Sequence, residues 1–347
     1  MSKWYQLSGS ENDTAICTKV ALARNIAGHN FTIRLSTQEK DQIAEEVENA
    51  LEQQLPGKFE ATRMKDFPRD AAISLAERGT VSPEFISSTE GRTFITSRDE
   101  SLTVMVCEED HLKIQAMLPG LELDKSYALA DQLDTVLDES LGFSFDKKLG
   151  YLTQCPTNIG TAMRASVMLQ LPALHIRGTI SNLARTVSKL GLRLTGSFGV
   201  GSRPVGSLYT LSNQMTLGIS EEAALANLKS FSLSIIQQER DAREELMSNL
   251  RFQDMLWRSY GTLKNARVMS YSEFMEALSV VRIGIANGEI DLPMTRANEL
   301  IFSQQPATLN SESDDELDRQ KRDELRAREI RGIFEDKAPE PPRQIDE

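Results

Sequence analysis

Hydrophobic and polar positions recur with two different periods along the chain. Ile43, Val47, Leu51 and Leu55 are spaced like one face of a helix, and the run Ser36 to Glu39 before them has the pattern of a capping box. Runs rich in alternating or β-branched residues predict strands instead. The predicted strands cover residues 92–97, 102–107, 111–118, 142–146, 175–180, 191–198 and 207–211.

Two further helices are predicted among these strands. Asp124 is placed to cap a helix that carries Leu129, Leu133 and Leu137, and residues 181–190 form a short helix that Gly191 can end. Strands and helices do not alternate regularly here. The pattern therefore predicts an α+β domain built on an antiparallel sheet flanked by helices.

From about residue 220 the chain becomes helical in pattern. A second capping box begins at Ser270, and Gly288 is placed to end that helix. Residues 311–316 form an acidic lead into a charged helix over 317–334, and three prolines follow. We expect a mixed domain over 1–242, an all-helical C-terminal domain over 243–335 and a disordered tail over 336–347.

Composition narrows the functional classes. The 39 Lys and Arg residues against 51 Asp and Glu residues give a net charge of −12, which argues against nucleic acid and anionic membranes as partners. No apolar run reaches the length of about 18 residues that a membrane-spanning helix needs, and the N-terminus does not resemble a signal peptide. Three cysteines in no zinc-binding pattern fit a reducing compartment, so we expect a cytoplasmic protein without a structural metal site.

Four segments carry the chemistry. They are 17–25, 107–115, 151–161 and 196–202, and the third contains the run Cys-Pro-Thr-Asn-Ile-Gly-Thr. In order and spacing they resemble the ATP:guanido phosphotransferases, or phosphagen kinases, and most closely the bacterial protein-arginine kinases. The resemblance covers nearly the whole chain. It implies a phosphagen-kinase sheet domain followed by a helical domain, and ATP with Mg²⁺ as the cofactor.

Such enzymes move the γ-phosphoryl group of ATP onto a guanidinium nitrogen. Arginine forks stabilise the phosphates, and carboxylates orient and deprotonate the guanidinium. By the resemblance, Glu109 is a catalytic carboxylate, Cys155 is the cysteine held near the guanidinium, and Arg164 is a phosphate-binding arginine. The nucleotide-binding set implied by the family comprises Thr18, Lys19, Lys113, Arg164, Ala165, Ser166, Val167 and Met168.

Several family positions are altered in this chain. Lys19 and Lys113 stand where the family has arginine, and lysine supplies a point charge without the bidentate fork. Ala21 and Thr195 replace two further arginines, and Val200 replaces the second catalytic glutamate. Arg193, on the same face of a strand as Thr195, and Arg203 are the candidates to compensate. We therefore expect phosphoryl transfer to protein arginine side chains to be weak or lost.

A second motif lies in the final helix. Arg322, Asp323, Arg326 and Ala327 match the pattern with which protein-arginine kinases bind phosphoarginine at a regulatory site. Two arginines four residues apart share a helical face and can fork onto one phosphate. This supports an alternative hypothesis, a pseudokinase that binds phosphoarginine or a partner protein. A chance match in so charged a helix is the competing explanation.

Each motif also has a purely structural explanation. The acidic run at 108–110 can be a solvated turn, and a cysteine such as Cys155 is commonly a small buried apolar residue. A free-arginine or creatine kinase is a third reading, and the helical C-terminal region speaks against it. The family further implies a homodimer, a small zinc-binding activator protein and an ATP-dependent protease as partners, beside protein arginine or phosphoarginine side chains.

Overall fold

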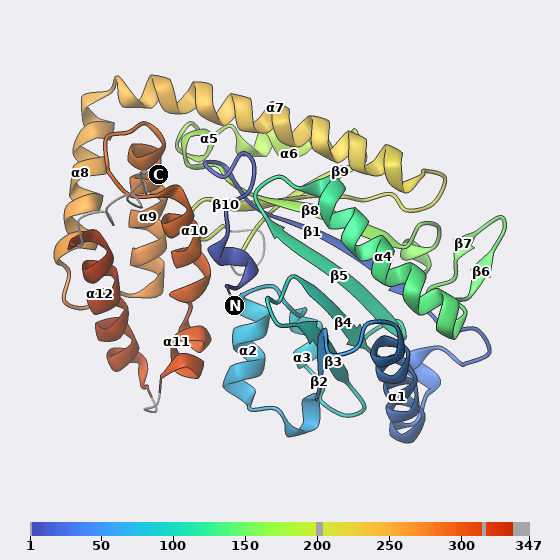
Figure 1. Ribbon diagram of the computed structural model, residues 1–347. Coiled ribbons are helices and arrows are strands. Elements are labelled where there is room, and N and C mark those ends of the chain that lie inside the picture. Colours follow the sequence, from blue (N-terminus) through green and yellow to red (C-terminus); the bar gives the residue numbers. More distant parts are fainter. Residues whose placement is uncertain (1, 199–203, 314–316, 336–347) are drawn as a thin grey trace, which may run out of the picture.

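The centre of the molecule is one eight-stranded antiparallel sheet (Figure 1), as the sequence predicts. The computed structural model describes residues 2–198, 204–313 and 317–335. The strand order is β2-β3-β4-β5-β1-β8-β10-β9. The strands are β1 (Ala15–Arg24), β2 (Phe59–Arg63), β3 (Thr93–Ser97), β4 (Leu102–Val106), β5 (Leu112–Pro119), β8 (Met163–Gln170), β9 (Leu192–Gly196) and β10 (Leu208–Asn213). A separate hairpin pairs β6 (Phe145–Asp146) with β7 (Gly150–Tyr151).

One face of the sheet builds the main apolar core. Alternate residues of the central strands, such as Val20, Ile114 and Val167, are fully buried there against the long helices. The helices that contribute to this core are α1 (Thr37–Gln54), α4 (Leu123–Leu141), α5 (Pro172–Ile176), α6 (Ile180–Ser188) and α7 (Glu221–Met247). Figure 1 shows α1 and α4 lying across the sheet and α7 running along its edge toward the C-terminal helices.

The other face of the central strands carries polar residues. In the strand register Lys19 pairs with Met117 of β5 and with Ser166 of β8, whereas Ala21 pairs with Gln115 and Arg164. Because side chains alternate along a strand, these residues and Lys113 point away from the main core. We call this surface the site face, defined by Lys19, Ala21, Lys113, Arg164 and Ser166.

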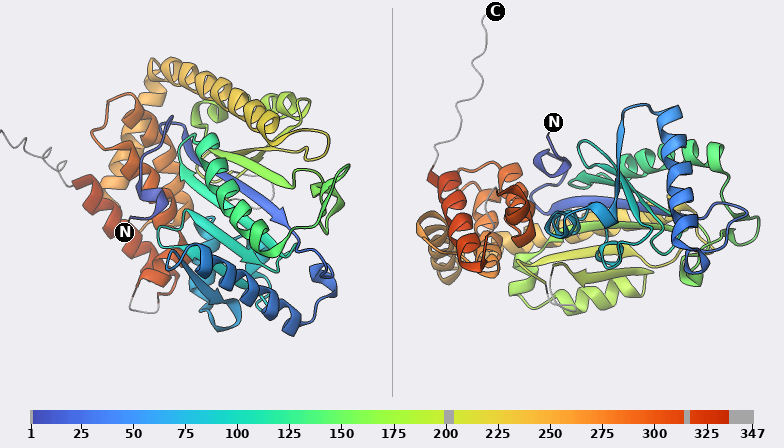
Figure 2. Two further views of the ribbon diagram at one scale, coloured as in Figure 1. Left: turned by 45° about the vertical axis from the view of Figure 1, so that its right-hand side comes forward. Right: turned by 90° about the horizontal axis from the view of Figure 1, so that it is seen from below.

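The C-terminal helices form a second apolar core beside the sheet (Figure 2). They are α8 (Leu250–Asn265), α9 (Tyr271–Ala286), α10 (Met294–Ser303), α11 (Pro306–Glu312) and α12 (Arg319–Glu335). Trp4 and Tyr5, in a short 3-10 helix (Trp4–Gln6), stack on Phe302 of α10 and fix the N-terminus to this core. A smaller third core lies under α2 (Arg69–Glu77) and α3 (Pro83–Ile86), against β3 and β4.

Most predicted elements are confirmed, and some need correction. The capping box at Ser36 is formed, and Gly288 follows the end of α9 with a positive φ of 76°. The strand predicted over 175–180 is wrong, because this segment belongs to α5 and the start of α6. The helix predicted from Asp124 begins earlier, at Leu123 with Glu122 as its N-cap, so Asp124 lies in its first turn.

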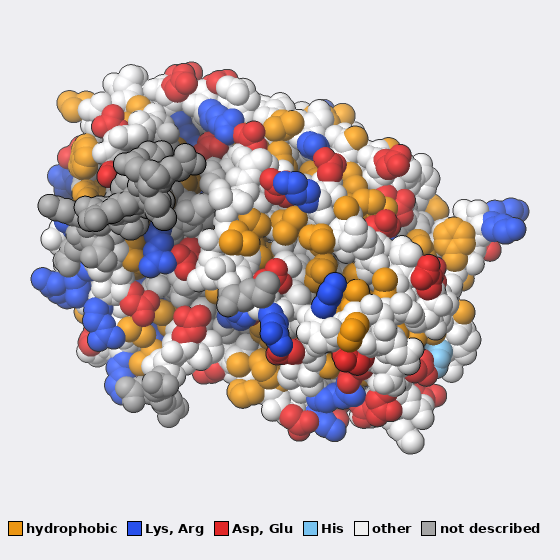
Figure 3. Space-filling model, viewed as in Figure 1, with side chains coloured by type: hydrophobic (Ala, Val, Ile, Leu, Met, Phe, Trp, Pro, Cys, Tyr) orange, Lys and Arg blue, Asp and Glu red, His pale blue; other side chains and the backbone are white. Residues whose placement is uncertain are grey.

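Three smaller differences concern segment ends. Only 145–146 of the predicted strand 142–146 are in a regular strand. Of the acidic lead 311–316, the first two residues end α11, and 314–316 lie outside the described residues. The tail predicted over 336–347 also lies outside them. Among the residues that the structure describes, no helix is both long enough and apolar enough to cross a membrane. On the molecular face seen in Figure 3, acidic and basic side chains are interspersed.

Candidate active site

The predicted catalytic residues meet at one end of the site face. A pocket of about 230 Å³ opens there between β1, β5 and β8. Its lining includes Ala21, Glu109, Lys113, Asn158 and Arg164. Two of these residues come from strands that are not adjacent in sequence, and two come from the connecting turns. The strand order β5-β1-β8 therefore brings three of the four predicted segments together. We call this the carboxylate pocket.

Glu109 lies in the tight turn between β4 and β5. Its carboxylate accepts a hydrogen bond from Asn158 Nδ2 at 3.4 Å, and the Cys155 thiol is within hydrogen-bonding reach. Burial raises the pKa of Glu109, and the neighbouring charges of Asp110 and Glu108 raise it further. The structure thus places Glu109 and Cys155 side by side, in a setting that makes the carboxylate a better proton acceptor than a free glutamate.

The turn is held by groups to which sequence reasoning gave no role. Asp110 is buried, and its Oδ1 accepts hydrogen bonds from the backbone N–H of Gln154 and from Asn25 Nδ2, both at 2.7 Å. His111 Nδ1 accepts from the backbone N–H of Ile26 at 3.0 Å, so its Nε2–H donates to the carbonyl of Asn30 at 2.7 Å. Burial lowers the pKa of His111, consistent with this neutral tautomer. These contacts join the turn to the Cys155 segment and to the end of β1.

Two of the predicted phosphate-binding cations line the same pocket. Arg164 donates to the carbonyl of Asn213 and to Asn158 Oδ1, each at 3.1 Å, and its side chain is exposed. Lys113 is paired with Glu108, whose Oε2 lies 3.1 Å from the ammonium. Ser82 Oγ donates to the other oxygen of Glu108 at 2.6 Å. Arg164 therefore presents its guanidinium to solvent, whereas the charge of Lys113 is already compensated.

Lys19 lies farther along the site face. It lines a second, smaller cavity of about 70 Å³ together with Ser166 and Met168. Thr18, Ala165 and Val167 point to the other side of the sheet and are buried. Thr18 Oγ1 donates to the carbonyl of Gly120 at 2.7 Å and accepts from the backbone N–H of Glu122, so it anchors the β5–α4 connection. The structure thus divides the predicted nucleotide-binding set between the two faces of the sheet.

Comparison with known proteins agrees with this geometry. The family model described as ATP:guanido phosphotransferase, C-terminal catalytic domain, matches residues 42–242, and that described as protein-arginine kinase McsB C-terminal domain matches residues 249–344. The protein-arginine kinase of Desulforamulus reducens is 40% identical over 337 residues, 95% of this chain and 94% of that protein. That of Clostridium acetobutylicum is 37% identical over 336 residues, covering 95% and 99%. The chain belongs to the protein-arginine kinase family.

Solved structures support the same fold. The substrate-free duplicated taurocyamine kinase from Schistosoma mansoni matches with a TM-score of 0.58 and 25% identity, covering 69% of this chain and 36% of that one. A lombricine kinase matches with a TM-score of 0.59 and 20% identity, covering 67% and 68%. The second likeness supports the fold alone. The predicted recognition and fold class are therefore both confirmed.

The positions at which this family member departs from the motif fall on the site face and its edge. Ala21 lines the carboxylate pocket with a methyl group only. Thr195 lies on β9, in register with Thr210 of β10, and Arg193 on the same strand is exposed. Val200 and Arg203 lie outside the described residues. Among the described residues that line the carboxylate pocket, Lys113 and Arg164 are the cations.

The phosphoarginine motif lies on α12, away from both cavities. Arg326 is 1% exposed, and it donates from Nε to the carbonyl of Gln304 at 3.0 Å and from Nη1 to the carbonyl of Met269 at 2.9 Å. It is also paired with Asp323 at 2.6 Å. Arg322 is partly exposed and donates to the carbonyl of Leu317 at 3.1 Å, and Ala327 is fully buried. The two arginines therefore have different surroundings although they share a helical face.

The residues present suit a phosphate-bound metal better than a metal held by protein alone. Among the described residues there is no group of three or more His, Cys, Asp or Glu side chains that could hold a metal ion. Mg²⁺ in kinases is bound by nucleotide phosphates, water and only one or two carboxylates. Glu108 and Glu109 at the pocket rim are the carboxylates that could contribute.

Proposed function

We propose that this protein is a protein-arginine kinase that acts in the cytoplasm, transfers the γ-phosphoryl group of Mg-ATP to arginine side chains of proteins, and does so with strongly reduced activity. The observation that supports it is the convergence of Glu109, Cys155 and Arg164 around one pocket. Phosphoryl transfer would take place within residues 1–242. The helices of 243–335 would form the regulatory domain.

The expected roles follow from these contacts. Glu109, with its raised pKa, would orient the substrate guanidinium and accept its proton as the N–P bond forms. Cys155, beside Glu109, would contact the same guanidinium. Arg164 would fork onto the phosphates, with Mg²⁺ neutralising further negative charge when ATP is bound.

The reduction in rate follows from the missing charge. Removing one preorganised donor from a transition state slows an enzyme by about 10²–10³-fold. Ala21 and Thr195 each remove one arginine, and Lys113 is compensated by Glu108. These losses act on one moving phosphoryl group, so they are not additive. A pocket that retains one free guanidinium would still support transfer far above the uncatalysed reaction.

A second candidate function is recognition of phosphoarginine by α12. The intact motif and the partly exposed Arg322 favour it. Arg326 is occupied by Gln304, Met269 and Asp323, so Arg322 would make the first contact with the phosphate. A homodimer, a zinc-binding activator and an ATP-dependent protease remain predictions from the family.

The first test is a direct assay of the product. The purified protein is incubated with Mg-ATP and a basic acceptor protein, and phosphoarginine is detected by mass spectrometry under conditions that preserve the acid-labile N–P bond. We expect a low yield that Glu109→Gln abolishes and that Glu45→Gln, a change on the exposed side of α1, leaves unchanged. Equal yields from wild type and Glu109→Gln would refute the assignment.

The second test concerns α12. Free phosphoarginine is titrated calorimetrically against the wild type, Arg322→Ala and Arg328→Ala, the last being an exposed arginine on the same helix. We expect binding that only Arg322→Ala removes. Binding without turnover would favour the pseudokinase hypothesis, and absence of heat with all three proteins would remove the phosphoarginine assignment.

A further inference from the structure

The small cavity next to Lys19 has two cationic residues in its wall. We call it the lysine cavity. Its lining comes from the site face, from the end of α2 and from the C-terminal helices. Lys19, Ser166 and Thr210 belong to the sheet, Arg78 follows α2, and Phe302 belongs to α10. A cavity of about 70 Å³ suits one compact ion rather than a nucleotide base with its sugar.

Lys19 lacks a counter-ion among the described residues. Its ammonium makes no hydrogen bond or ion pair with any of them, and burial and the nearby charge of Lys113 lower its pKa. A desolvated charge without a partner is unfavourable, and proteins normally pair such groups. The cavity in front of Lys19 therefore lacks an anion rather than another donor.

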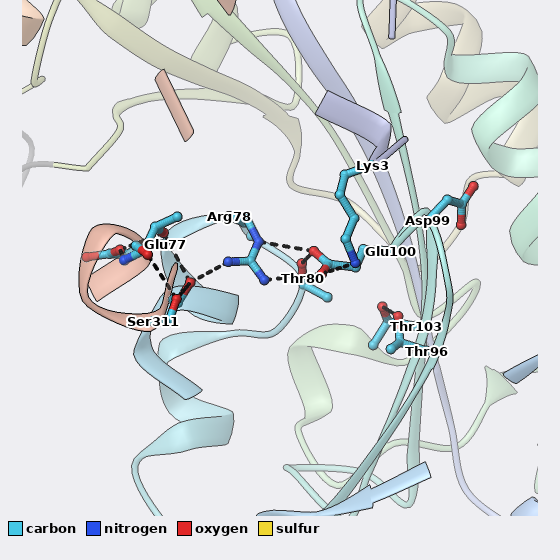
Figure 4. A network of polar contacts seen from close by, with 12 residues as sticks. Lys3, Glu77, Arg78, Thr80, Thr96, Asp99, Glu100, Thr103 and Ser311 are labelled. Carbon is cyan, nitrogen blue, oxygen red and sulfur yellow. Dashed lines mark hydrogen bonds and ion pairs between the residues drawn. The ribbon is translucent and has the colours of Figure 1, made fainter. Parts of the chain in front are cut away.

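Arg78 brings a guanidinium to the same cavity. Its Nε and Nη2 form a fork onto Glu100 at 3.1 and 3.2 Å, and Lys3 contacts the same carboxylate at 2.8 Å (Figure 4). Nη1 donates to Ser74 Oγ. Arginine has five N–H donors, and these contacts use three. Two N–H groups of Arg78 are thus without a partner among the described residues.

The charges around the cavity add to a positive total. Lys3 and Arg78 share the single carboxylate of Glu100, which leaves one positive charge, and Lys19 adds a second. The hydroxyl groups of Ser166 and Thr210 also line the cavity. Two cations and two hydroxyls in a small, largely buried space are a donor set suited to a tetrahedral oxyanion.

We propose that the lysine cavity binds one phosphate-type oxyanion between Lys19 and Arg78. Arg78 lies outside all four motif segments, so its helix supplies a guanidinium that the altered positions Ala21 and Thr195 do not. Where the anion is a phosphate of a bound nucleotide, this rests on the proposed function. Free inorganic phosphate presents the same chemistry.

The competing explanation gives Arg78 a structural role alone. Arg78 donates to Ser74 Oγ, which in turn donates to Thr308 Oγ1 of α11 at 3.1 Å, and the next residue back, Glu77, accepts from the backbone N–H groups of Ala307 and Thr308. The Arg78–Glu100 pair then only joins α2 to the β3–β4 turn and to α11. The two explanations predict opposite effects when Glu100 loses its charge.

The experiment measures anion affinity by calorimetry, with inorganic phosphate and with ADP, for the wild type and four variants. Arg78→Gln and Lys19→Met should each weaken binding by tenfold or more. Glu100→Gln should strengthen it severalfold, because it removes the carboxylate that competes for Arg78. Arg98→Gln, which changes an exposed arginine next to the same turn, should have no effect. Circular dichroism and thermal melts identify any variant that fails to fold.

Each result decides between the explanations. Weaker binding by the folded Glu100→Gln variant would overturn the proposal, and so would unchanged binding by Lys19→Met, whose side chain makes no contact that folding needs. No heat with phosphate or ADP in the wild type would also overturn it. Phosphate binding without ADP binding would support the cavity and count against the nucleotide part of the proposed function.

Discussion

Lys113 Nζ lies 3.1 Å from Glu108 Oε2 at the edge of the carboxylate pocket. The lysine that stands at a family arginine position therefore spends its charge on a neighbouring glutamate. A guanidinium has five donors and can hold a carboxylate and a phosphate at once, whereas the ammonium is a single point charge. This pair explains why a cation can be present in the pocket and still contribute little to phosphate binding.

Neutralising Glu108 should release this lysine. Glu108→Gln is expected to strengthen binding of ADP by about threefold to tenfold, the equivalent of about 1 kcal/mol. Calorimetric titration at low ionic strength measures it, with Glu139→Gln on the exposed side of α4 as the control. An unchanged or weaker affinity in Glu108→Gln would mean that the Lys113–Glu108 pair does not restrain the pocket.

Glu109 should titrate above the range of an ordinary glutamate. Burial, Asp110 and Glu108 all raise its pKa, so its proton is held to higher pH and any transfer that needs the ionised carboxylate rises over that higher range. Glu108→Gln removes one of these charges and should move the midpoint to lower pH. Carbon-13 NMR of glutamate-labelled protein, assigned with Glu109→Gln, measures the midpoint without requiring turnover. A midpoint that stays in place in Glu108→Gln would contradict this electrostatic account.

Restoring the family charges should restore the rate only when they are combined. Ala21→Arg, Thr195→Arg and Val200→Glu return two phosphate-binding forks and one carboxylate. Each change alone should raise phosphoarginine formation by less than about tenfold, because the remaining gaps still limit the transition state. The triple variant should exceed the wild type by about 10³-fold or more. Equal rates for the triple variant and the wild type would show that other features limit activity.

The helix α5 shows why part of the fold escapes sequence reasoning. The segment after Pro172 reads as a strand by its local pattern. In the structure, the buried Glu239 of α7 accepts hydrogen bonds from the backbone N–H groups of Ala173 and Leu174, at 2.9 and 3.0 Å. These are the unpaired donors at a helix start. A cap supplied from more than sixty residues away leaves no signal in the local sequence.

Glu239 should therefore be essential to stability. Its second partner is Arg243, at 3.0 Å, so Glu239→Ala leaves both a buried guanidinium and two helix N–H groups without a partner. We expect a loss of about 3–5 kcal/mol in the free energy of unfolding, measured by urea denaturation. Glu244→Ala, at an exposed position of the same helix, should change it by less than about 0.5 kcal/mol. Similar losses in both variants would argue against this role.

The candidate site was predictable to a different degree. Motif order placed Glu109, Cys155 and Arg164 correctly in one region, because each lies in a short segment with a distinctive composition. Side-chain pairing was not predictable: the Lys113–Glu108 contact depends on the turn between β4 and β5. The presence of Arg78 beside Lys19 depends on how α2 packs over the sheet, and nothing in the local sequence of α2 indicates it.

The two arginines of α12 should differ in what they stabilise. Arg326 is buried and joins α12 to the carbonyls of Met269 and Gln304, so Arg326→Ala leaves these acceptors and Asp323 without a partner. We expect it to lower the free energy of unfolding by about 2–4 kcal/mol. Arg322 is partly exposed, and Arg322→Ala should cost less than about 1 kcal/mol.

This difference determines how the phosphoarginine hypothesis can be tested. Loss of ligand binding in Arg326→Ala would follow from a loosened helix as readily as from a lost contact, whereas loss in Arg322→Ala reports on the contact itself. Urea denaturation of both variants, with Arg328→Ala as the surface control, separates the two effects. If Arg326→Ala were as stable as Arg328→Ala, its hydrogen bonds to Met269 and Gln304 would contribute nothing, and Arg326 would be free to serve the ligand instead.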